Sequence, residues 1–130
     1  MSLNLTILPE RFAVCRLQPG ADFGEPAARN SLFALTRTTD ELSLVCSEAH
    51  APREALIEPG WRAFKVTGPL DFALTGILAS LANPLADNGV GIFAVSTYDT
   101  DYVLVKETDL QRAVQALRAA GHWIHNSGNI

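Results

Sequence analysis

The stretch that decides the fold runs from Ile92 to Val105 and reads IFAVSTYDTDYVLV. Its two apolar segments, rich in residues that favour strands, enclose six polar or half-polar residues, Ser96 to Asp101. A hairpin turn needs only about two to five residues, which are usually Gly or Asn where a positive φ is required. We therefore predict two antiparallel strands joined by a turn that carries more hydroxyl and carboxylate groups than a turn requires.

A second copy of this pattern appears when the chain is aligned with itself at an offset of 60 residues. The segment Leu32 to Val45, LFALTRTTDELSLV, then matches Ile92 to Val105 without a gap, and Glu41 meets Asp101. Both copies therefore predict strand, polar turn and strand. We interpret the match as an internal repeat, although alternation in strand-rich segments produces some such matches by itself.

Composition narrows the class of protein. The chain has 130 residues, of which 48% are hydrophobic, and a formal net charge of -4. Its Lys and Arg residues are scattered singly, whereas nucleic-acid-binding surfaces cluster them.

No apolar run resembles a signal peptide or approaches the roughly 18 residues of a membrane span. Cys15 and Cys46 lie inside apolar runs, as buried free thiols do in a reducing compartment. We predict a cytoplasmic protein that binds neither nucleic acid nor membranes.

The remaining elements follow from the spacing of apolar residues. Alternation predicts strands at Leu3 to Leu8, Phe12 to Leu17, Leu32 to Thr38, Leu42 to Cys46, Arg62 to Val66, Gly91 to Val95 and Tyr102 to Lys106, with a final strand in His122 to Asn126. A spacing of three and four predicts a helix from Asp71 to Asn88, in which Pro84 predicts a kink or a break. A second helix is predicted to begin at Thr108 with a Thr108/Gln111 capping box and to stop at Gly121.

The order of these elements predicts the fold class. A helix that connects parallel strands in one sheet forms a right-handed crossover, so both helices should lie on one face of the sheet. We therefore predict an α+β, ferredoxin-like βαββαβ sandwich in tandem copies. The first copy, residues 1–60, should be degenerate and consist mostly of strands, and residues 61–130 should form a complete domain.

The segment Trp61 to Leu117, WRAFKVTGPLDFALTGILASLANPLADNGVGIFAVSTYDTDYVLVKETDLQRAVQAL, resembles an ACT domain. The most specific parts of this likeness are Thr75-Gly76-Ile77 before an apolar helix and the turn Ser96 to Asp101 before Val-Leu-Val. The branch it resembles comprises the CASTOR-type arginine sensors and small bacterial ACT-domain proteins. A weaker correspondence covers Phe12 to Glu48.

This resemblance implies a regulatory or sensor protein that binds a small effector, usually an amino acid, and performs no chemistry. In the resembling sensors the effector contacts the loop that enters the first helix and the hairpin after the second strand. Carried onto this chain, the implied ligand-binding residues are Leu74, Gly76, Ile77, Thr97, Tyr98 and Asp101. The family pairs its domains, and the degenerate first half leaves an incomplete seam and open strand edges, so we predict a homodimer.

The chemistry of an α-amino acid agrees with these positions. Its carboxylate needs N–H donors, which the start of the helix after Gly76 can supply, and its ammonium needs an acceptor such as Asp101. Simpler roles remain open for both residues. Gly76 can serve the helix entry or close packing, and Asp101 can cap its own turn.

Other functions remain as alternatives. The chain can be a structural or protein-interaction module that kept the fold without a pocket. A hydrolase that uses Asp99 and Asp101 would need a nucleophile and a base, and no such pair is visible in the sequence. His122 and His125 have a spacing that can hold a metal, but no third ligand stands nearby. We predict no catalytic residue, no cofactor and no metal.

Overall fold

The computed structural model describes residues 1–24, 30–71 and 75–126. The chain divides into two compact units. We call Met1–Pro9 with Arg62–Ile130 the helical unit, and Glu10–Trp61 the strand unit. The strand β5 (Leu56–Val66) contributes to both, because the division falls between Trp61 and Arg62.

The described residues of the helical unit form five strands and two α-helices. Its elements are β1 (Asn4–Ile7), the C-terminal part of β5, α1 (Ile77–Asp87), β6 (Phe93–Ser96), β7 (Asp101–Lys106), the short 3-10 turn η2 (Glu107–Asp109), α2 (Leu110–Ala119) and β8 (Trp123–Asn126). The strand order is β6-β7-β5-β1-β8. From β5 to β8 the chain follows the predicted βαββαβ order, with β1 inserted between β5 and β8.

The inserted strand β1 places the first nine residues in the helical unit. It pairs antiparallel with β5 and parallel with β8. Leu5 and Ile7 are buried in the same core as the residues of the two helices. The first copy predicted from the sequence, residues 1–60, includes these nine residues. Spacing along the chain does not reveal that β1 pairs with β5 and β8.

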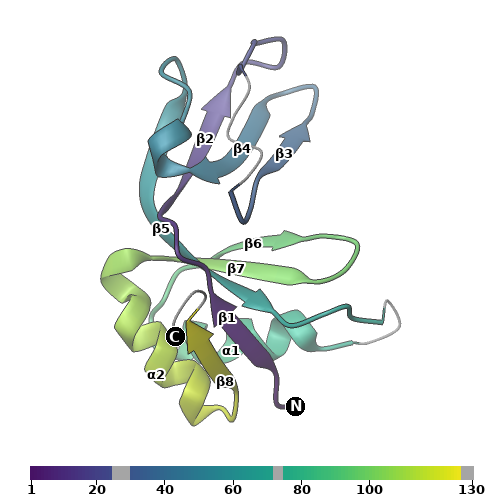
Figure 1. Cartoon of the computed structure of the whole chain (residues 1–130), viewed down its shortest axis with the longest axis vertical. Helices are drawn as coiled ribbons and strands as arrows, with labels where there is room; N and C mark the ends of the chain where they lie inside the picture. The colour runs from purple at the N-terminus through teal and green to yellow at the C-terminus, as the bar shows by residue number, and fades with distance from the viewer. Residues whose placement is uncertain (25–29, 72–74, 127–130) are drawn as a thin grey trace. The chain divides into compact units, whose positions relative to one another are not determined.

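Both helices of the helical unit cover one face of its sheet (Figure 1). The core between the helices and the strands consists of Leu5, Ile7, Phe64, Val66, Leu81, Leu85, Val90, Val103, Val105, Ala113, Ala116 and Leu117. Burial of such apolar surface is the dominant favourable term in folding. The prediction that both helices lie on the same face is confirmed.

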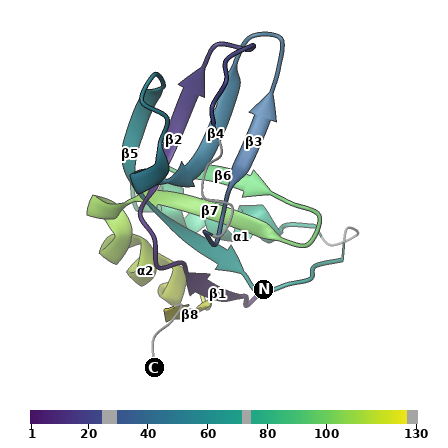
Figure 2. The ribbon, with the colours of Figure 1, turned by 45° about the horizontal axis from the view of Figure 1, so that its top comes forward.

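The strand unit has the strand order β3-β4-β2-β5 (Figure 2). Its elements are β2 (Phe12–Leu17), β3 (Ala34–Arg37), β4 (Leu42–Ser47), the 3-10 turn η1 (Glu48–His50) and the N-terminal part of β5. The hairpin β3–β4 pairs through β4 with β2, and the hairpin β6–β7 pairs through β7 with β5. Both units therefore place a hairpin beside the strand that precedes it in the chain. The described residues of the strand unit contain no α-helix, and apolar residues of its connecting segments, such as Phe23 and Phe33, pack against the core instead.

Both helices differ in detail from the sequence prediction. Helix α1 begins at Ile77 rather than at Asp71, because Gly76 has a left-handed φ of 80° that a continuing helix cannot contain. Pro84 does not end the helix, which runs on to Asp87. Helix α2 follows a 3-10 turn, and its N-cap residue Asp109 makes no side-chain cap bond, so the predicted capping box at Thr108 is wrong.

The two hairpins are equivalent at an offset of 59 residues, not 60. Thr97 N–H donates to Thr100 O at 2.8 Å, and Thr38 N–H donates to Glu41 O at 2.9 Å, so the turns match when 38 is set against 97. The strand pairings agree, since Ser96 opposes Asp101 and Arg37 opposes Leu42. The ungapped alignment is therefore one residue out of register with the backbone, and a shift of one residue moves a side chain to the other face of a strand.

Cys15 and Cys46 are buried free thiols in the core of the strand unit. A hydrogen bond to Cys46, together with burial, raises the pKa of Cys15. This keeps the Cys15 thiol protonated and unreactive. Among the described residues, no helix is long and apolar enough to cross a membrane.

Candidate functional site

A pocket of about 380 Å³ lies in the helical unit between the start of α1 and the β6–β7 turn. Its lining comes from two parts of the chain, Leu70, Asp71 and Gly76 to Leu78 on one side, and Ser96 to Asp101 on the other. Pockets for small ligands usually have volumes of about 300 to 1,000 Å³. The volume therefore suits a small molecule of the size of an amino acid.

Five of the six residues assigned to a ligand from the sequence line this pocket. They are Gly76, Ile77, Thr97, Tyr98 and Asp101. The sixth, Leu74, lies outside the described residues. The structure therefore brings together residues that are separated by about twenty positions in the chain, at one end of the sheet.

The start of α1 depends on the conformation of Gly76. Its φ of 80° lies in the left-handed region, which favours glycine, and a Cβ built on it would meet no atom within 4 Å. The glycine is therefore required for the backbone conformation rather than for close packing. Ser80 N–H bonds to Gly76 O at 2.9 Å and so begins the regular helical pattern. The first N–H groups of a helix have no partner within it and carry its positive dipole end.

The opposite wall is a turn that is held by Thr97. The Thr97 hydroxyl donates to Thr100 O at 3.0 Å and accepts from Thr100 N–H at 3.3 Å. The turn thus has its own side-chain bonds, which do not involve Asp101. The Thr100 hydroxyl takes no part in these bonds and donates to Val66 O on β5 at 2.6 Å.

The charges of the lining are all of one sign. Asp71, Asp99 and Asp101 contribute three carboxylates, and the lining residues that the structure describes include no Lys, Arg, His or Cys. Asp99 is exposed and also borders the pocket. An acidic lining favours a ligand that carries a positive charge, although water screens part of this attraction.

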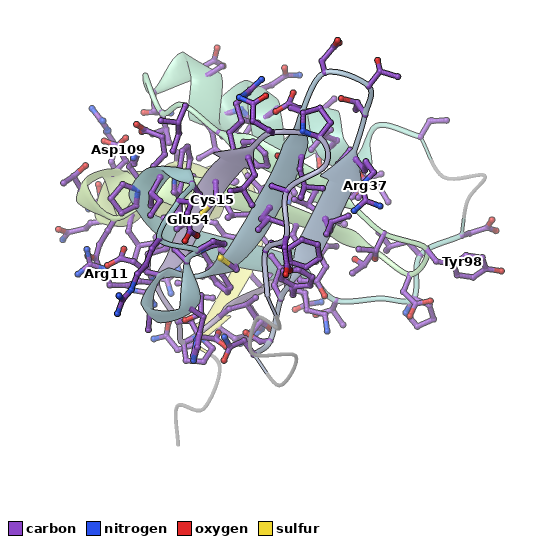
Figure 3. All side chains as sticks on the ribbon, turned by 90° about the horizontal axis from the view of Figure 1, so that it is seen from above. Arg11, Cys15, Arg37, Glu54, Tyr98 and Asp109 are labelled. Atoms are coloured by element: carbon purple, nitrogen blue, oxygen red, sulfur yellow. The ribbon has the colours of Figure 1, made fainter. Side chains whose placement is uncertain are left out.

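Tyr98 is the aromatic residue among the lining residues that the structure describes. Its side chain extends outward from the tip of the β6–β7 turn (Figure 3), and the residue is 81% exposed. A bound cation can lie over the face of a ring in this position.

Sequence reasoning missed part of the lining. Leu70, Leu78 and Thr100 line the pocket but are not among the residues that the sequence assigned to a ligand. The Gly68-Pro69 pair was the available signal that the chain turns back before α1.

The two C-terminal histidines lie in different surroundings. The buried ring of His122 accepts from Leu3 N–H at Nδ1, at 3.1 Å, so Nε2 carries the proton and donates to Ser80 O at 3.0 Å. Both nitrogens of His122 are therefore occupied. His125 is exposed, and no group of three metal-ligating side chains occurs among the residues that the structure describes.

Comparison with known proteins identifies the domain. A family model of the ACT domain matches residues 56–119, and a second model, for an N-terminal domain, matches residues 10–54. The cytosolic arginine sensor for mTORC1 subunit 1 of Bos taurus is 33% identical over 101 residues, which cover 69% of this chain and 31% of that protein. The chain thus spans about a third of the length of the curated relatives it matches.

Two solved structures extend the comparison. A crystal structure of a protein from Agobacterium tumefaciens is 37% identical, with a TM-score of 0.90 over 99% of this chain and 96% of that chain. The regulatory subunit of aspartate kinase from Thermus thermophilus has a TM-score of 0.62 and 13% identity, and covers 92% of this chain and 99% of that chain. The second likeness shows the fold alone. The chain belongs to the ACT domain family, with its ACT domain at residues 56–119.

Proposed function

We propose that this protein is a regulatory or sensor protein that binds an amino acid in the pocket between α1 and the β6–β7 turn. The observation that carries the proposal is the convergence of Gly76, Ile77, Thr97, Tyr98 and Asp101 on one acidic pocket at the start of a helix. The ACT domain match supports an amino acid as the class of ligand. No reaction is proposed, because the described lining contains neither His nor Cys, which most often serve as general base or reactive nucleophile.

The geometry suggests how such a ligand would be oriented. Its α-carboxylate would accept hydrogen bonds from the first N–H groups of α1, at Ile77 and Leu78, where the helix dipole is positive. Its positively charged groups would face the carboxylates of Asp99 and Asp101, as charge-assisted hydrogen bonds require. A cationic side chain of the ligand would also be attracted to the ring face of Tyr98.

Arginine is therefore the first ligand to test. It carries two positive groups, and the curated relatives are named as arginine sensors. The word cytosolic in the same name supports a cytoplasmic location for this chain. Glutamate and aspartate should bind less well, because a second carboxylate would approach an acidic lining.

We also propose that the protein works as a homodimer. Among the described strands, β3 and β6 each pair with only one neighbour, and a second copy could cover such open edges. A sedimentation-equilibrium measurement with and without arginine should give twice the chain mass of 14.0 kDa in at least one condition. A 14.0 kDa monomer in both conditions would reject the dimer.

Isothermal titration with each of the twenty amino acids tests the ligand. We expect a saturable signal with arginine and an affinity lowered at least about tenfold by Asp101→Ala, which corresponds to about 1.4 kcal/mol. Asp40→Ala is the matched control, because Asp40 lies in the equivalent turn of the strand unit. It should leave the affinity unchanged.

Silence across all twenty amino acids would reject the proposal. It would favour the alternative of a structural or protein-interaction module with this fold. Equal binding by the parent protein and Asp101→Ala would instead remove Asp101 from the site and leave the amino-acid pocket in place.

A further inference from the structure

The two walls of the pocket are connected to each other at its base. One wall continues from β5 through Thr67 to Leu70 towards α1, and the other is the turn from Thr97 to Thr100. The Thr100 hydroxyl donates to Val66 O at 2.6 Å, and Leu70 N–H donates to Asp99 O at 2.7 Å. These two hydrogen bonds join segments that are about thirty residues apart in the chain.

Between these two bonds the walls also touch directly at Gly68. A Cβ added to Gly68 would lie 2.9 Å from Asp99 O and 3.1 Å from Thr100 Cβ. Contacts below 3.0 Å to a backbone oxygen cannot be relieved by a side-chain rotation, so one wall would have to move. Gly68 therefore sets how closely the two walls approach.

The Thr100 hydroxyl is not needed for the turn itself. In the strand unit, Thr38 forms the same turn with Glu41, through its N–H and its hydroxyl, although Glu41 has no hydroxyl. Thr100 stands at the position equivalent to Glu41, and it is only 5% exposed. Its hydroxyl is thus committed to the bond across to β5, inside the protein, where leaving the acceptor unpaired would be costly.

We propose that Gly68 and Thr100 are positioning residues that set the width of the ligand pocket before any ligand arrives. They act through the two bonds and the close contact between the walls, and they need not touch the ligand. Because the ligand's partners on α1 and on the turn belong to different walls, a change of wall spacing separates groups that must act together. This inference rests on the proposed function for its effect on affinity, but not for its effect on the unliganded protein.

Amide hydrogen exchange in the unliganded protein is the first test. In Thr100→Val the hydroxyl is replaced by a methyl group of similar size, so the amide of Leu70 should exchange about tenfold faster than in the parent protein. Thr100→Ser keeps the hydroxyl and should restore slow exchange. Gly68→Ala should accelerate the exchange of Leu70 by moving the walls apart, whereas Gly91→Ala should not, because a Cβ at Gly91 meets no atom within 4 Å.

Titration with L-arginine is the second test. Thr100→Val and Gly68→Ala should raise the dissociation constant about fivefold to tenfold, at a temperature where both variants are folded by circular dichroism. Thr100→Ser should stay within about twofold to threefold of the parent protein. Thr38→Val, which alters the equivalent turn in the strand unit, should leave the affinity unchanged.

The outcomes separate this inference from the proposed function. If the parent protein does not bind arginine or any other amino acid, the proposed function fails, and the exchange of Leu70 still decides whether the two residues join the walls. Leu70 exchange that is unchanged in both Thr100→Val and Gly68→Ala would overturn the inference. So would faster exchange with an unchanged affinity for arginine, because the walls would then be joined without setting the pocket.

Discussion

The helical unit and the strand unit use the same hairpin for different results. In each, a Thr residue holds a four-residue turn through its N–H and hydroxyl, Thr97 in one and Thr38 in the other. In the helical unit this turn faces the start of α1 and lines a pocket. In the strand unit the described residues contain no α-helix. The comparison teaches that the polar turn belongs to the fold, while the pocket depends on the helix start placed opposite it.

The largest effect is expected from substitutions in the cores of the two units. Leu85 lies in α1 and Leu44 in β4, and both are fully buried. Leu85→Ala should lower the free energy of unfolding by about 3 to 4 kcal/mol, because a cavity between a helix and a sheet cannot collapse easily. Leu44→Ala should cost about 2 kcal/mol, because connecting segments cover that core and can move inward. Urea unfolding followed by circular dichroism measures both values.

Two results would contradict this comparison. An equal loss in the two variants would show that helices and connecting segments cover their cores equally well. A decrease in the free energy of unfolding of less than about 1 kcal/mol for Leu85→Ala would mean that the helical unit repacks around the cavity.

A smaller effect is expected at His122, which follows the end of α2 and joins three elements of the helical unit. Its ring accepts from Leu3 N–H and donates to Ser80 O in α1. His122→Ala should lower the free energy of unfolding by about 2 kcal/mol, because it leaves two backbone groups without their partners. The control is His125→Ala, which removes an exposed ring and should change stability by less than about 0.5 kcal/mol. Equal losses from the two changes would show that the His122 bonds contribute nothing specific.

Much of the fold follows from local sequence signals. The strand Phe12–Leu17 has the bounds that apolar alternation predicts, and β8 lies within the predicted final strand. Helix starts were harder to predict. The start of α1 depends on the positive φ of Gly76, and the start of α2 on a preceding 3-10 turn, and neither has a periodic signal. The insertion of β1 beside β8 depends on pairing between the two ends of the chain, which spacing cannot reveal.

The candidate site shows the same limit. The resemblance to a family supplied Gly76, Ile77, Thr97, Tyr98 and Asp101, and all of them line one pocket. It did not supply the contacts at the base of the pocket. Thr100 reaches back to Val66, and Gly68 touches Asp99, because of how the backbone folds over long separations in sequence. The offset of 60 also paired Asp101 with Glu41, whereas the turn hydrogen bonds pair Thr100 with Glu41.

The smallest expected effect concerns how the strand unit holds the segment before β3. Ser31 donates from its N–H to Glu10 Oε2 at 2.8 Å, and its hydroxyl donates to Glu10 Oε1. Burial alone would raise the pKa of Glu10, but the bonds from Ser31 outweigh it and hold the pKa below its usual value. The charged form therefore stabilises the fold above the pKa of the unfolded chain, about 4.3, and this contribution is lost as the pH falls through the lower pKa of the folded state.

Glu10→Gln tests this link through the pH dependence of stability. At pH 7 the variant should be less stable by about 0.5 kcal/mol, since water screens a partly exposed carboxylate. The difference should shrink as the pH falls through the lowered pKa of Glu10, where the carboxylate becomes neutral. Thermal unfolding at pH 7 and pH 3 measures it, with Ser31→Ala as a matched change that removes the hydroxyl bond but keeps the N–H bond. A deficit that is the same at both pH values would show that the charge of Glu10 does not hold this segment, which would then depend on the apolar contacts of the strand unit alone.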